Sequence, residues 1–163
     1  MNAAKRVLGI DPGSAICGWA VVESVNRQKF SLIDCDCIRT RPSMSTAERL
    51  YALYLDLKAV ITKYQPQEMA VEELFFVQNV KTGIVVGQAR GVILLSAAEA
   101  GLPVFEYKPN TIKLALTGYG HADKKQVQDM VKLILKLPSH IKQDDTADAV
   151  AVALTHIQSR QLQ

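Results

Sequence analysis

Three groups of acidic residues stand beside segments that are otherwise apolar. A carboxylate buried without a partner costs free energy, so such positions call for an explanation. Two carboxylates ~4 Å apart repel each other by about 4 kcal/mol at an effective dielectric of 20, so a cluster of them requires a positive partner. Oxygen ligands alone select hard cations such as Mg²⁺ or Mn²⁺. The acids are Asp11, Glu72, Glu73, Asp144, Asp145 and Asp148.

Two adjacent glutamates, Glu72 and Glu73, interrupt the apolar segment 69–76, which has the composition of a buried strand. Neighbouring side chains of a strand point to opposite faces, so only one of the two is expected to face Asp11. The spacing does not choose between them. Asp11 itself begins the turn sequence Asp-Pro-Gly, in which an aspartate commonly bonds to the backbone that follows it. A structural role for Asp11 is therefore the alternative.

Three aspartates precede the apolar run 149–154, which is expected to lie in a helix. Asp144 suits the N-cap of this helix, where a carboxylate favours the helix dipole. Asp145 and Asp148 are three residues apart and share one helix face. Convergence of this pair with Asp11 and one glutamate would form a metal site for phosphodiester cleavage. In such sites two ions ~3.5–4 Å apart activate a water and stabilise the leaving oxygen.

The segments that must position these acids alternate between strand and helix patterns. Three strands separated only by short turns indicate an antiparallel meander, and the later strands are joined by helical crossovers. The sequence therefore predicts an α/β fold, a mixed sheet with helices on its faces, in a single domain over residues 1–163. Strands are expected at 6–10, 17–25, 29–38, 69–76 and 102–107, and helices at 45–64, 82–100, from Pro109 onward, at 124–137 and at 145–158.

Positive charge is concentrated in one part of the chain. The formal net charge is +3 at pH 7, whereas residues 104–142 contain seven lysines against three acids, a local excess of +4. Such a stretch is either a solvated helix face or a surface that binds phosphates.

The cysteines, the histidines and the chain start suggest no further chemistry. Three cysteines without a Cys-x-x-Cys pair indicate reduced thiols rather than disulfides or zinc. The three histidines show no pattern typical of a catalytic or ligand role. The start of the chain lacks a signal-peptide pattern, and no apolar run is expected to reach the length of a membrane span. A soluble, cytoplasmic protein is therefore predicted.

With these residues identified, the chain closely resembles the RuvC family of Holliday-junction resolvases, within the retroviral-integrase and ribonuclease H superfamily. The matching motifs occur in the family's order and cover nearly the whole chain. Ala15 and Cys17 differ from the arginine and threonine of several family members, which affects the loop beside Asp11 but none of the acids. The motifs are Leu8–Ser14 with Gly18-Trp19, Ala70–Phe75, Gly87–Gly91, Pro103–Tyr107, Gly118–Gly120, Lys124–Gln128 and Asp145–Asp148.

The resemblance implies a ribonuclease H-like fold whose five-stranded mixed sheet has the order 3-2-1-4-5. It implies Mg²⁺ as the cofactor, with Mn²⁺ as a substitute and two ions in each active site. The catalytic and metal-binding carboxylates would be Asp11, Glu72, Asp145 and Asp148, which selects Glu72 over Glu73. The DNA-binding positions would be Phe75, Arg90, Lys113, Lys124 and Lys125, with the aromatic ring stacked near the strand crossover.

The implied activity is that of a structure-selective endonuclease that resolves four-way (Holliday) junction DNA. It would make paired symmetric nicks by attack of a metal-activated water on phosphodiesters. Two symmetric nicks suit a twofold homodimer, and the family dimerises through the helix expected at 82–100. Branch-migration proteins of the RuvAB type are implied as partners, and no membrane is expected. Candidates for the dimer surface are Val85, Val86, Ile93 and Leu94, with core burial as the alternative for each.

Other classes of function share part of this pattern. Another nuclease of the superfamily, YqgF-like or a structure-nonspecific DNase, would have the same acids but would need no four-way junction. A non-catalytic junction-binding module would bind without cutting. Sugar-kinase and actin-type ATPases also begin with a strand that ends in Asp-x-Gly, but they bind nucleotide between two such domains, and this chain has room for one. The sequence leaves open whether Asp144 or Glu73 assists the site.

Overall fold

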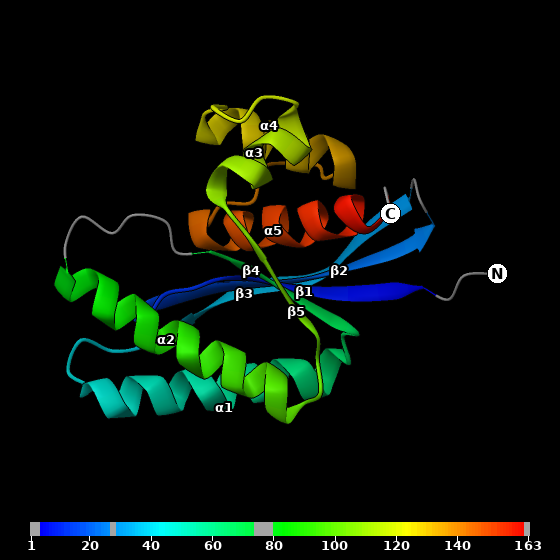
Figure 1. Ribbon diagram of the computed structural model, residues 1–163. Helices are drawn as coiled ribbons and strands as arrows, with labels where there is room; N and C mark the ends of the chain where they lie inside the picture. Colours follow the sequence, from blue (N-terminus) through cyan, green and yellow to red (C-terminus); the bar gives the residue numbers. More distant parts are fainter. Residues whose placement is uncertain (1–3, 27–28, 74–79, 162–163) are drawn as a thin grey trace.

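The computed structural model describes residues 4–26, 29–73 and 80–161 of the chain (Figure 1). Within these ranges the strands are β1 (Lys5–Asp11), β2 (Ile16–Asn26), β3 (Lys29–Arg39), β4 (Glu68–Glu72) and β5 (Val104–Tyr107). The helices are α1 (Thr46–Tyr64), α2 (Val80–Glu99), α3 (Pro109–Thr117), α4 (Lys124–Leu135) and α5 (Asp144–Gln161).

The strands form one mixed sheet in the order β3-β2-β1-β4-β5, as predicted. The first three strands pair antiparallel, because only short connections join them. β4 pairs parallel with both β1 and β5, and parallel pairing requires the long crossovers that contain α1 and α2. The parallel pair β1–β4 places the ends of two strands at the same edge of the sheet.

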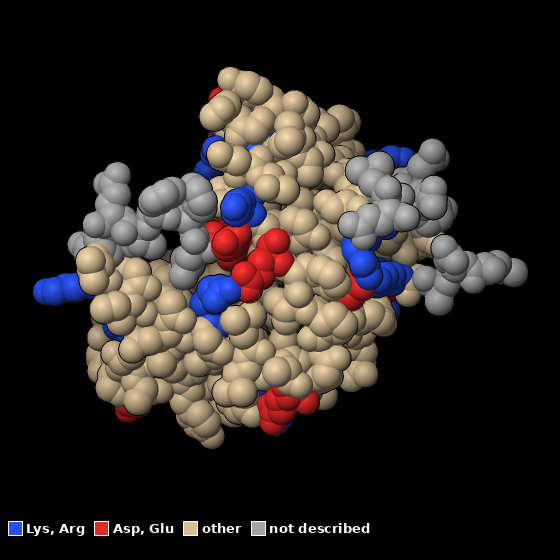
Figure 2. Space-filling view, viewed as in Figure 1, with Lys and Arg blue, Asp and Glu red and all other residues tan. Residues whose placement is uncertain are grey.

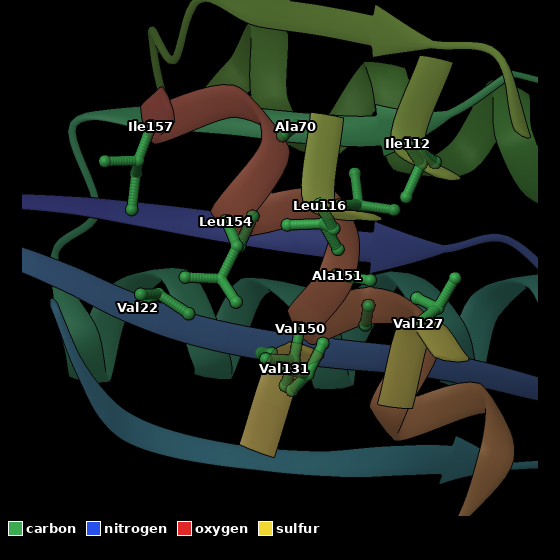
Figure 3. Packing of buried hydrophobic residues seen from close by; sticks show 14 of the residues in the cluster. Val22, Ala70, Ile112, Leu116, Val127, Val131, Val150, Ala151, Leu154 and Ile157 are labelled. Carbon is green, nitrogen blue, oxygen red and sulfur yellow. The ribbon is translucent and has the colours of Figure 1, made fainter. Parts of the chain in front are cut away.

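Helices cover both faces of the sheet and divide the core in two. α1 and α2 pack on one face, whereas α5 lies along the other and is covered in turn by α3 and α4 (Figure 1). Successive side chains of β1 point to opposite faces of the sheet, so Val7 packs in the α5 layer and Leu8 in the α1–α2 layer. Figure 3 shows the α5 layer, a cluster that includes Leu154 of α5, Val22 of the sheet and Val131 of α4.

Local capping interactions account for most helix boundaries. α1 begins at a capping box between Ser45 and Glu48, which confirms the sequence pattern. α4 ends at Leu135, before the predicted 137, because Lys136 adopts a left-handed conformation (φ 52°). α5 begins one residue earlier than predicted, since the amide of Ala147 already bonds to the carbonyl of Gln143 at 3.0 Å. The prediction of Asp144 as the N-cap is therefore wrong by one position.

The outer ends of two strands differ from the prediction. β4 is predicted over 69–76 and spans Glu68–Glu72, whereas positions 74–76 lie outside the described residues. β5 begins at Val104 rather than at 102, although the carbonyl of Pro103 still accepts a bond of 2.9 Å from the amide of Met69.

α2 exposes an unusually apolar surface. Val85 is 38% exposed, whereas Ile93 is fully buried, so Ile93 belongs to the core rather than to a partner surface. By length and composition alone, this 20-residue helix could cross a membrane, and 22% of its most apolar stretch is buried in the protein. This differs from the expectation that no apolar segment is long enough. The large apolar side chains that α2 exposes are Val80, Ile84, Val85 and Leu95.

A buried polar network ties α5 to the sheet away from the acids. Nε2 of His156 donates to the carboxylate of Glu68 at 2.6 Å. Because a carboxylate can only accept, Nδ1 of His156 accepts from the hydroxyl of Tyr107 at 2.7 Å. Burial lowers the pKa of His156, which keeps the ring neutral. Lys5 and Arg160 balance the charge of Glu68 at 2.6 and 3.3 Å.

Candidate active site

The ends of the two central parallel strands bring Asp11 and Glu72 together. Asp11 is the last residue of β1 and Glu72 the last residue of β4. Glu72 follows Ala70 at a spacing of two, and Ala70 packs in the α5 layer, so Glu72 faces the same side. The carboxyl groups of Asp11 and Glu72 lie close enough to act on each other's pKa. Glu73 instead bonds through its amide to the carbonyl of Tyr107 at 2.8 Å.

The first turns of α5 bring Asp145 and Asp148 to the same edge of the sheet. Burial, followed by the charges of Glu72 and Asp148 and then of Asp145, raises the pKa of Asp11 to about 8. Burial also raises the pKa of Glu72 and the pKa of Asp148. Glu72, Asp145 and Asp148 therefore all lie close enough to Asp11 to raise its pKa.

Two of the predicted lysines lie beside these acids. Nζ of Lys124 is 3.2 Å from the carboxylate of Asp148 and 3.3 Å from that of Asp144. These two carboxylates outweigh the opposing effect of burial and raise the pKa of Lys124. Figure 2 shows acidic side chains gathered between basic side chains on one face of the molecule. A cavity of about 240 Å³ is lined by Glu72, Pro109, Ile112, Lys113, Lys124, Val127, Asp148 and Ala151.

The remaining predicted residues are placed differently. The carboxylate of Asp144 is 66% exposed and engages Lys124 and Gln128 rather than Asp11. Lys125 is exposed on α4, next to Lys124. Arg90 lies on α2, on the opposite face of the sheet, and forms an ion pair with Glu106. Phe75 lies outside the described residues.

A contact that the sequence pattern did not single out joins β3 to the start of α5. Sγ of Cys37, on β3, lies 2.9 Å from the hydroxyl oxygen of Thr146. Thr146 is buried between Asp145 and Ala147 in the first turns of α5. All three cysteines of the chain are free thiols. No spacing signals the Cys37–Thr146 contact, because 109 positions separate its partners.

The acids and lysines lie in a chain that matches the family model described as "Crossover junction endodeoxyribonuclease RuvC" over residues 7–156. The chain belongs to the RuvC family. The RuvC protein of Roseiflexus sp. (strain RS-1) is 54% identical over 153 residues, which are 94% of this chain and 90% of the relative. That of Pelotomaculum thermopropionicum is 52% identical over 150 residues, 92% of this chain and 91% of the relative.

Solved structures of the RuvC family have the same fold. Thermus thermophilus RuvC in complex with a Holliday junction substrate superposes with a TM-score of 0.93 at 37% identity, covering 97% of this chain and 96% of that one. The yeast mitochondrial Holliday junction resolvase Ydc2 gives a TM-score of 0.69 at 13% identity, covering 96% of this chain and 81% of its own. At this low identity, the similarity to Ydc2 concerns the fold alone. The predicted ribonuclease H-like fold is confirmed.

Proposed function

We propose that the protein is a crossover junction endodeoxyribonuclease that hydrolyses phosphodiester bonds of four-way junction DNA. One observation carries the proposal: in a chain of the RuvC family, four carboxylates from three separate elements meet at one edge of the sheet. Lys124 pairs with Asp148, and Lys113 lines the same cavity as Glu72, so ammonium groups that can bind a phosphodiester lie beside these acids.

The donor set of this site fits a hard divalent cation. Asp11, Glu72, Asp145 and Asp148 would hold Mg²⁺, with Mn²⁺ as a substitute and two ions per site. When bound, the ions supply an activated water and stabilise the leaving oxygen. The raised pKa of Asp11 supports the fit, because a bound cation would offset both the burial and the carboxylate repulsion that favour a proton there. Among the described residues, no group of three such side chains already surrounds a common point.

The lysines beside the acids would hold the DNA backbone. Lys113 and Lys124 line the same cavity as Glu72, and Lys125 extends the basic surface along α4. Ammonium groups at these positions would pair with phosphates on either side of the scissile bond, which makes the affinity for DNA dependent on salt. A DNA-binding role for Arg90 and a stacking role for Phe75 stay predictions from the family resemblance.

We also propose a twofold homodimer, because resolution of a four-way junction requires two symmetric nicks. The exposed apolar side chains of α2 supply a surface for a second copy of the chain. A surface of this composition is unusual on a monomeric soluble protein, and a protein partner explains it without a membrane. Branch-migration proteins of the RuvAB type, a cytoplasmic location and a single nuclease domain stay predictions.

Cleavage of a labelled synthetic four-way junction in Mg²⁺ tests the proposed function. The wild-type protein should make paired, symmetric nicks, and Asp11→Asn should abolish cleavage while junction binding in a gel-shift assay stays nearly unchanged. Duplex and single-stranded DNA of the same sequence serve as substrate controls. Cleavage by Asp11→Asn would contradict the metal site, and equal cutting of all three DNAs would contradict the preference for junctions.

A further inference from the structure

α5 approaches the sheet most closely at two glycines. A Cβ atom added at Gly18 would overlap the carbonyl oxygen of Asp145, and it would lie 2.5 Å from the carbonyl carbon and 3.1 Å from the amide of Thr146. A Cβ added at Gly9 would overlap the carbonyl oxygen of Ala149 and lie 2.8 Å from Cβ of Ala153. Real Cβ atoms essentially never come within 3.0 Å of such neighbours. Each glycine therefore lets the backbone of α5 lie closer to the sheet than an alanine at the same position would allow.

Gly18 occupies a special place in the sheet. It is the cross-strand partner of Asp11 in the β1–β2 ladder and of Cys37 in the β2–β3 ladder. The three residues form a row across β1, β2 and β3 beneath the first turn of α5. Asp11 contributes a carboxylate of the site, Gly18 leaves the space filled by the backbone of Asp145, and Cys37 contacts the next residue, Thr146, at 2.9 Å.

We infer that Gly18, with the contact between Cys37 and Thr146, is a positioning residue that sets how far Asp145 and Asp148 lie from Asp11. The inference rests on the proposed metal site. An alanine at residue 18 must widen the separation between its Cβ atom and the Asp145 carbonyl carbon by at least 0.5 Å, from 2.5 to 3.0 Å, and the separation from the carbonyl oxygen by more, so β2 and the start of α5 must move apart. Productive geometry in a catalytic site tolerates about 0.5 Å, and Mg²⁺ demands near-ideal ligand distances of about 2.0–2.1 Å.

Gly18 determines how close the start of α5 lies to the sheet. The Cys37 contact ties the same turn of the helix to the neighbouring strand β3. Cys37 and Thr146 exchange one hydrogen bond between a strand and the first turn of the helix, and Thr146 also reaches the side chain of Gln143 at 3.3 Å. A serine at residue 37 keeps a hydrogen-bonding group there. A valine keeps the volume and removes the bond. Comparison of the two variants therefore distinguishes the effect of the hydrogen bond from the effect of side-chain volume.

The experiment compares Gly18→Ala, Cys37→Ser and Cys37→Val with the wild type in the full-length protein. Mn²⁺ affinity is measured by calorimetry, junction affinity in EDTA by gel shift, and the cleavage rate in single-turnover reactions. Gly18→Ala should weaken Mn²⁺ binding by about 10–100-fold and slow cleavage by about 100-fold, with junction affinity in EDTA unchanged. Cys37→Val should weaken Mn²⁺ binding severalfold, whereas Cys37→Ser should stay close to the wild type.

Val60→Ala controls for a general loss of stability, because Val60 lies in α1 on the opposite face of the sheet. It should lower the melting temperature without changing Mn²⁺ affinity. Wild-type metal binding and cleavage by Gly18→Ala would overturn the inference, as would equal metal losses in Val60→Ala. If Gly18→Ala does not fold, equal Mn²⁺ affinities of the two Cys37 variants overturn it. A wild-type protein that binds no Mn²⁺ would instead overturn the proposed metal site.

Discussion

Asp11 is the residue whose protonation depends most on the fold. Burial and the neighbouring carboxylates raise its pKa from 3.8 to about 8. At pH values between 3.8 and about 8, Asp11 is protonated in the folded, metal-free protein but ionised in the unfolded chain. The contribution of Asp11 to stability is therefore largest at low pH. That contribution is lost as the pH rises through about 8.

This linkage predicts a pH dependence that a single substitution removes. Between about pH 6.5 and pH 8, the melting temperature of the metal-free wild type should fall relative to that of Asp11→Asn, which has no titrating group at residue 11. The difference should reach a few degrees, since ~1 kcal/mol corresponds to ~2–4 °C in a protein of this size. Thermal scans in EDTA measure it. Saturating Mg²⁺ should abolish this pH dependence. If the melting temperatures of the wild type and Asp11→Asn change in parallel with pH in the absence of metal, the raised pKa of Asp11 is contradicted.

The lysines beside the acids should contribute charge rather than sequence preference. Lys113→Ala and Lys124→Ala should each weaken junction binding and reduce the slope of log affinity against log salt concentration by about 1. Gel-shift titrations at several salt concentrations measure the slope. Lys58→Ala is the matched control, because Lys58 pairs with Glu99 on the α1–α2 side of the sheet. Slopes equal to that of the control would exclude phosphate contacts by these lysines.

At the scale of elements, α5 is fixed to the sheet near both ends. Its first turns rest on Gly18 and Gly9, and its later part is held by His156, which bridges Glu68 of β4 and Tyr107 of β5. Satisfied hydrogen bonds make such a buried network favourable, whereas a member left without its partner is costly. The network lies on the same helix as Asp145 and Asp148 but does not include them.

Loss of the imidazole should therefore destabilise the protein without altering the chemistry of the site. His156→Ala should lower the free energy of unfolding by about 3 kcal/mol, from the cavity and the unpaired groups together. Urea titration measures the change. His140→Ala, which breaks an exposed pair with Asp129, should cost less than about 1 kcal/mol. Equal losses in the two variants would contradict the structural role of the network.

The sequence predicted the elements better than their contacts. Hydrophobic period and turn residues placed every strand and helix to within a few residues, because these signals are local. The choice of Glu72 over Glu73 needed the family resemblance, since alternation says only that the two differ in direction. The partnership of His156 with Glu68 joins residues 88 positions apart, and no local pattern encodes it.

The orientation of α2 was equally hidden from the sequence. Its apolar residues surround the helix, so periodicity could not separate the buried Ile93 from the exposed Ile84 and Leu95. Only the packed structure distinguishes the core face from the outer face.

At the scale of the whole molecule, the acidic edge and the outer face of α2 would place the proposed chemistry and the proposed dimer contact on different surfaces. Ile84→Glu with Leu95→Glu should convert the proposed dimer to a monomer, because each glutamate would place a charge in an apolar interface. Light scattering coupled to gel filtration measures the mass. Paired nicking of a junction should be lost with the dimer. Tyr51→Glu, at a site on α1 that is 63% exposed, is the control. A double variant that stays dimeric would exclude the α2 surface.

The position of α5 after every other element of the fold has a consequence for synthesis. This helix contributes two of the four acids and lies against β1, β2 and β4. A chain leaves the ribosome N-terminus first, so Asp11 and Glu72 emerge long before Asp145 and Asp148. A product that stops before residue 144 lacks half of the carboxylates and the helix that covers one face of the sheet. A copy that stops there is therefore expected to be unable to cut DNA, and the order of translation itself withholds the activity until α5 has been made.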